Sequence, residues 1–117
     1  MPRKHCLFTI IILCVLCFSA PHLYSSDHSA EEVNNIITSV ETKLLELKKS
    51  GAEDYAKEDL LEIERRISGS RELLKKDNED QAYFEINIGK LYFKKIEARK
   101  QLFDAEIEYS ELKNSLK

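Results

Sequence analysis

The C-terminal part of the chain, residues 80–117, contains no proline and only one glycine, Gly89. Proline disrupts helix interiors more than any other residue, so this stretch predicts one long helix. Apolar residues recur along it at alternating spacings of three and four, which is the pattern of a helix–helix seam. The first stripe is Ala82, Ile86, Gly89, Phe93, Ile96, Phe103 and Ile107, interrupted by Lys100. The second stripe is Phe84, Ile88, Leu91, Ala98, Leu102, Ala105, Tyr109, Leu112 and Leu116, interrupted by Lys95.

The two stripes point to nearly opposite sides of the helix, because successive residues are separated by about 100°. A helix with two apolar faces is expected to lie between two neighbours. For residues 82–98 we therefore expect each stripe to face one of two neighbouring helices. We interpret Lys95 and Lys100 as long side chains that cover apolar neighbours and keep the ammonium group in water. The alternative is a buried charge that fixes the register of a partner helix.

A shorter helix is predicted over residues 29–49. Ser29 and Glu32 have the spacing of a capping box, and Gly51 is a natural left-handed stop after the helix. One face carries an apolar residue at every third or fourth position. This face consists of Ala30, Val33, Ile37, Val40, Leu44 and Leu47.

A second short helix is predicted over residues 56–76, after a turn at residues 52–55. Its seam is Leu60, Ile63, Ile67, Ser70 and Leu74. Glycine costs about 1 kcal/mol relative to alanine inside a helix, so we expect a kink or a close helix contact at residues 68–70. The third helix would then run over residues 79–116. No alternating pattern typical of a β-strand occurs in the chain.

These elements predict an all-α fold, a three-helix antiparallel bundle with a long, projecting, coiled-coil-like C-terminal helix. The shorter helices can cover only about half of the third, so the part after Lys100 should project by about 25 Å. That part carries an apolar stripe, and exposed stripes of this kind usually mark an interface. The predicted interaction residues are Leu102, Ala105, Tyr109, Leu112 and Leu116.

The N-terminus has the pattern of a secretory signal peptide. Arg3 and Lys4 precede an apolar run over residues 6–18, which is too short for the roughly 20 residues that span a membrane. We assign residues 1–20 to the signal, with an alternative cleavage site as late as residue 26. Residues 21–28 form a linker and residues 29–117 a single helical domain. Since Pro21 would hinder cleavage after Ala20, an uncleaved N-terminal anchor is the alternative.

All three cysteines, Cys6, Cys14 and Cys17, lie within the predicted signal. Cleavage beyond Cys17 would leave no thiol for a disulfide, a zinc site or a nucleophile. A lipid on Cys17, as in bacterial lipoproteins, is a second hypothesis. It is disfavoured because Leu16 stands where a small residue is preferred.

The composition points away from nucleic acids and from catalysis. The net charge of the 117-residue chain is −3, whereas phosphate binding requires a basic surface. The predicted helices contain no histidine, and Gly51, Gly69 and Gly89 are isolated rather than grouped in a phosphate-binding loop. We therefore expect no enzyme activity, no cofactor and no metal site.

Residues 51–60 (GAEDYAKEDL) and 73–82 (LLKKDNEDQA) carry a family resemblance. They are similar to an alanine-rich helical-hairpin domain of unknown function that occurs in bacterial envelope proteins and lipoproteins. The resemblance covers about half of the chain, which departs from it by having isoleucine, phenylalanine and tyrosine where the family has alanine. It implies an envelope location and no catalytic residue.

Together these features suggest an exported, non-enzymatic helical protein of the periplasm or cell envelope. It would act by binding a protein partner or itself through the C-terminal helix. The membrane would be involved only through the N-terminal segment or a lipid on Cys17. The alternative is a periplasmic carrier or chaperone that holds apolar ligands or clients along the exposed stripe.

Overall fold

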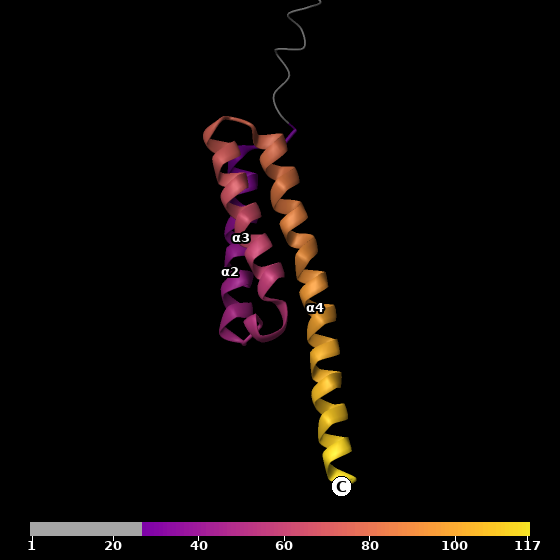
Figure 1. Ribbon diagram of the computed structural model, residues 1–117. Coiled ribbons are helices and arrows are strands. Elements are labelled where there is room, and N and C mark those ends of the chain that lie inside the picture. Colours follow the sequence, from indigo (N-terminus) through magenta and orange to yellow (C-terminus); the bar gives the residue numbers. More distant parts are fainter. Residues whose placement is uncertain (1–26) are drawn as a thin grey trace, which may run out of the picture.

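The computed structural model describes residues 27–117 (Figure 1). Within this range the protein is all-α, with helices α2 (Ala30–Lys49), α3 (Glu53–Lys75) and α4 (Glu79–Ser115). Consecutive helices run antiparallel, and the predicted bundle with a long projecting C-terminal helix is confirmed (Figure 1). The predicted signal at residues 1–20, Cys17 and most of the linker lie outside the described residues.

Helix α2 begins and ends where its sequence signals indicate. The Ser29 hydroxyl accepts a hydrogen bond from the backbone N–H of Glu32 at 3.1 Å, so the predicted N-cap is confirmed. After Lys49 the chain turns through Gly51, whose φ of 87° is unstrained only for glycine. The residues of α2 that face the bundle are buried, namely Val33, Ile37, Val40 and Leu44.

Helix α3 starts three residues before its predicted start. The expected turn at residues 52–55 is instead a first helical turn, in which Ala56 donates its backbone N–H to the carbonyl of Ala52 at 2.9 Å. Ala56 then departs from helical geometry, with φ −142° and ψ 32°, so the helix is kinked at that residue. The reason lies in packing, because the kink leaves both Ala52 and Ala56 buried.

The expected irregularity at residues 68–70 is absent. The helix continues through Gly69, and a side chain at that position would meet no atom within 4 Å. The close helix contact occurs at Gly89 of α4, where an added Cβ would lie 3.3 Å from Cβ of Arg66. Arg66 also bridges the two helices through a 2.8 Å hydrogen bond from its Nη1 to Glu85. This bond raises the pKa of the Arg66 guanidinium above its ordinary value.

Both α2 and α3 pack on one side of α4. The buried residues of α4 are Ala82, Ile86, Gly89, Phe93 and Ile96, all from the first stripe. The expectation that the second stripe of residues 82–98 faces another helix of the chain is therefore wrong. A single apolar face of α4 is enough for both neighbours, which share it between them, and the second stripe is left on the outside.

Beyond the bundle, α4 continues as a projecting arm (Figure 1). Ile96 is its last buried residue, and Phe103 is the last that is half-buried. The predicted projection after about residue 100 is thus confirmed.

Candidate interaction surface

The most distinctive surface of the described chain is the exposed second stripe of α4. It runs from Phe84, beside the bundle, to Leu116 at the tip of the arm, with Ile88 half-buried and Lys95 as its one polar member. At 1.5 Å per residue this length corresponds to about 48 Å. Large side chains of the stripe face solvent, since Phe84 is 64% exposed and Tyr109 is 68% exposed. Exposed apolar surface of this extent makes the second stripe the candidate interaction surface of the described chain.

The predicted interaction residues form the distal half of this stripe. All five lie on the arm beyond the core and are exposed, namely Leu102, Ala105, Tyr109, Leu112 and Leu116. Their position beyond the bundle agrees with the predicted projection, because the lengths of the shorter helices limit what they cover; their role in an interaction stays a prediction. The proximal half of the stripe, Phe84, Ile88 and Leu91, is not among the predicted interaction residues, because the sequence predicts that another helix of the bundle covers it.

A shallow hollow lies on the proximal half of the stripe. It has a volume of about 420 Å³ and is lined by Phe84, Asn87, Ile88, Lys90, Leu91 and Lys94. Its apolar floor with lysines at the edge can receive an apolar side chain from another helix.

Ion pairs anchor the arm where it leaves the bundle. Asp59 of α3 is 3% exposed, and one of its carboxylate oxygens lies 3.3 Å from Nζ of Lys95. The other oxygen lies 2.5 Å from Nε of Arg99. Lys95 is therefore not a buried seam charge: its side chain is 55% exposed, and its ammonium group reaches back to α3. Lys100 is exposed as well.

Asp59 was not predicted as a core residue, although a signal existed. It precedes Ile63 by four residues, which places a carboxylate on the apolar face of the helix. A charge in that position requires a cation from a neighbouring element. Nearby, the rings of Tyr55 and Phe103 lie 5.3 Å apart and extend the contact by almost two turns beyond Ile96.

Charge is distributed unevenly along the exposed part of α4. Residues 90–100 are basic, with Lys90, Lys94, Lys95, Arg99 and Lys100 against the single acid Glu97. Residues 101–112 contain only acids among their charged residues, namely Asp104, Glu106, Glu108 and Glu111. The second stripe is therefore flanked by positive charge beside the bundle and by negative charge along most of the arm.

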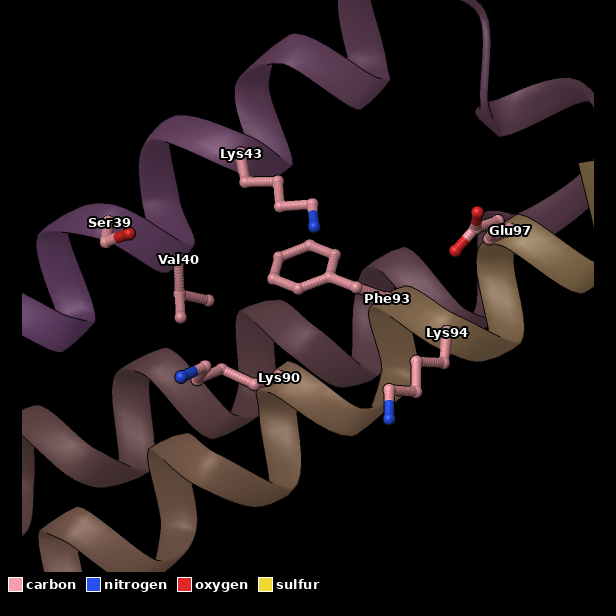
Figure 2. A pocket seen from close by; sticks show the side chains of 7 residues that line it. All are labelled: Ser39, Val40, Lys43, Lys90, Phe93, Lys94 and Glu97. Atoms are coloured by element: carbon pink, nitrogen blue, oxygen red, sulfur yellow. The ribbon is translucent and has the colours of Figure 1, made fainter.

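A separate groove lies between α2 and α4 (Figure 2). It has a volume of about 410 Å³, and Phe93 and Val40 provide apolar surface. Nζ of Lys43 lies 4.7 Å from the centre of the Phe93 ring, in the geometry of a cation–π contact. Lys90 and Lys94 complete the lining from α4, together with Ser39 and Glu97. Within residues 27–117, none of the three lysines has an ion-pair partner.

No cluster of metal-binding side chains is found in the described part of the chain, and none of its helices is long and apolar enough to cross a membrane. No protein-family model, curated protein or solved structure matches this chain.

Proposed function

We propose that this chain is an exported, non-enzymatic helical protein of the bacterial cell envelope that acts through association. Its second stripe on α4 would bind another protein or a second copy of the chain. The observation that carries the proposal is the exposure of the stripe from Phe84 to Leu116, along which only Ile88 is half-buried. When a partner helix covers apolar residues that face water over such a length, the free energy of the system falls.

The envelope location is supported by the sequence of residues 1–20 and by the resemblance of residues 51–60 and 73–82. The basic start and apolar run are typical of a signal peptide. Periplasmic release and attachment through the N-terminus or a lipid on Cys17 are both compatible with an arm that projects from the bundle.

The substitution Leu112→Asp tests the association. Leu112 is 58% exposed on the arm, so a carboxylate there should abolish association and leave the bundle folded. The matched control is Asn114→Asp, which adds the same charge two residues away and off the stripe. Mass in solution and capture of partners from envelope extracts are measured for both variants and the parent.

Association of the parent and the control, but not of Leu112→Asp, supports the proposal. A parent that stays monomeric and captures nothing contradicts it. Circular dichroism should show nearly equal helix content in the two variants, because neither position belongs to the core.

A second candidate function, a carrier of apolar ligands, is favoured by the groove around Phe93 (Figure 2). Apolar surface ringed by lysines suits an amphiphile with an anionic head. Organic extraction of protein purified from its host would then release a bound anionic lipid, and Lys43→Glu would lower the recovered amount. Extracts without such material would contradict the carrier function.

A further inference from the structure

We propose that the partner of the second stripe is the second stripe of another copy of this chain, running antiparallel and centred near residue 100. This inference rests on the proposed function and adds to it the identity and direction of the partner. It is carried by two independent features, the distribution of charge along α4 and the sizes of the side chains in the stripe.

The charges favour the antiparallel direction. In that arrangement the basic part of each α4, residues 90–100, lies beside the acidic part, residues 101–112, of the other. Lys94 and Glu108 both directly precede a stripe residue, and in the register centred near residue 100 they face each other across the interface. Neither has an ion-pair partner within the described chain, so both charges are free to pair between copies.

The side-chain sizes favour the same register. In this register the numbers of two residues that face each other, one from each copy, add up to about 200. Every stripe residue then faces a stripe residue of the other copy. Small residues then face large ones, with Ala98 opposite the partner's Leu102 and the stem of Lys95 opposite the partner's Ala105. The partner's Leu112 and Leu116 reach Ile88 and Phe84, at the hollow of about 420 Å³ described above. Alternation of large and small side chains lets two helices pack closely.

A parallel pairing lacks both advantages. Each stripe residue would face its own copy, so Lys95 would oppose the partner's Lys95 and Ala98 the partner's Ala98. The flanking Lys94 would lie next to the partner's Arg99, which places like charges together.

The rest of the fold leaves room for the antiparallel pair. Because α2 and α3 cover only the first stripe, the bundles of the two copies lie on opposite outer sides of the paired α4 helices. They also lie at opposite ends of the pair, since each bundle covers only the N-terminal half of its own α4 (Figure 1).

The substitution Lys94→Glu distinguishes the two directions by the sign of its effect. In the antiparallel pair the new carboxylate at position 94 lies next to the partner's Glu108, and symmetry repeats this repulsion once. The dissociation constant of the dimer should therefore rise about tenfold. In a parallel pair the same substitution would remove a repulsion with Arg99 and tighten the dimer. The double variant Lys94→Glu with Glu108→Lys should restore the parent affinity. Lys49→Glu, an equal charge change at the exposed end of α2, is the control and should change the constant less than twofold.

Cross-linking gives an independent reading of direction. The full-length chain is used with Cys6, Cys14 and Cys17 changed to serine. Gln101→Cys places a thiol close to its symmetry mate only in the antiparallel register, whereas Ala105→Cys does so only in a parallel pair. A short bis-maleimide reagent should therefore yield covalent dimers of Gln101→Cys and few of Ala105→Cys.

The failures of the inference and of the proposed function are distinguishable. Tighter association of Lys94→Glu, or efficient cross-linking of Ala105→Cys alone, overturns the antiparallel pairing while association stands. A monomeric parent that captures a different protein, with capture lost in Leu112→Asp, also overturns self-pairing but supports the proposed function. A parent that is monomeric and captures nothing overturns both.

Discussion

Asp59 of α3 and Arg99 of α4 form an ion pair with an N–O distance of 2.5 Å at the point where the arm leaves the bundle. The pair is asymmetric, because the Asp59 side chain is 4% exposed and the Arg99 side chain is 45% exposed. The carboxylate has lost most of its water, whereas the guanidinium retains much of it. Removing one partner therefore has different consequences from removing the other.

The double variant Lys95→Gln with Arg99→Gln should destabilise the fold more than Asp59→Asn. The first leaves a buried carboxylate without a cation, and breaking a buried pair in this way typically costs about 3–5 kcal/mol. We expect a cost at the lower end of that range, because the side chains of Lys95 and Arg99 are about half exposed. The second leaves two cations that water can reach, and about 1–2 kcal/mol is expected. Urea unfolding of both variants at neutral pH measures the difference. Equal costs would mean that Asp59 is hydrated in solution.

Alanine substitutions at two glycines should have different effects. Gly69 lies within α3 with no atom near an added Cβ, so Gly69→Ala should stabilise the fold by about 0.5–1 kcal/mol through helix propensity. At Gly89 the same gain is opposed by the 3.3 Å approach to Arg66, and the net effect should be smaller or destabilising. Thermal unfolding of the two variants tests this order, and a larger gain at Gly89 would contradict the close packing of α3 and α4.

Truncation of Ile67 should cost about 2–5 kcal/mol, because its side chain is 5% exposed and lies in the core between the helices. The control is Leu61→Ala on the same helix, where the side chain is 46% exposed and the cost should stay below about 1 kcal/mol. Denaturant unfolding followed by far-UV circular dichroism gives both values. A cost below about 0.5 kcal/mol for Ile67→Ala would show that α3 packs through another face.

Export should remove the N-terminus. The expected mature chain begins between residues 21 and 27, because residues 1–20 have the pattern of a signal and the latest candidate cleavage site is at residue 26. The intact mass of protein recovered from its native host determines the start. The mass of the whole precursor would instead establish an N-terminal anchor, and an added diacylglycerol at Cys17 a lipoprotein.

The helices themselves are readable from the sequence because their signals are local. Ser29 and Gly51 mark the ends of α2, and the three–four spacing marks the buried face of each helix. The projection of the arm also follows from the sequence, since it depends only on helix lengths and short connections. The same lengths predict that the interaction residues Leu102 to Leu116 lie outside the bundle.

What only the tertiary structure decided is which apolar face of α4 the bundle uses. The sequence offers two stripes of similar quality, and their periodicity is identical, so no local rule separates them. The choice depends on contacts with α2 and α3, which pack together on the first stripe through Ile86, Phe93 and Ile96. The kink at Ala56, the approach of Gly89 to Arg66 and the pairing of Asp59 with Arg99 follow from the same contacts. The last two join residues far apart in the sequence, and only three-dimensional packing brings those residues together.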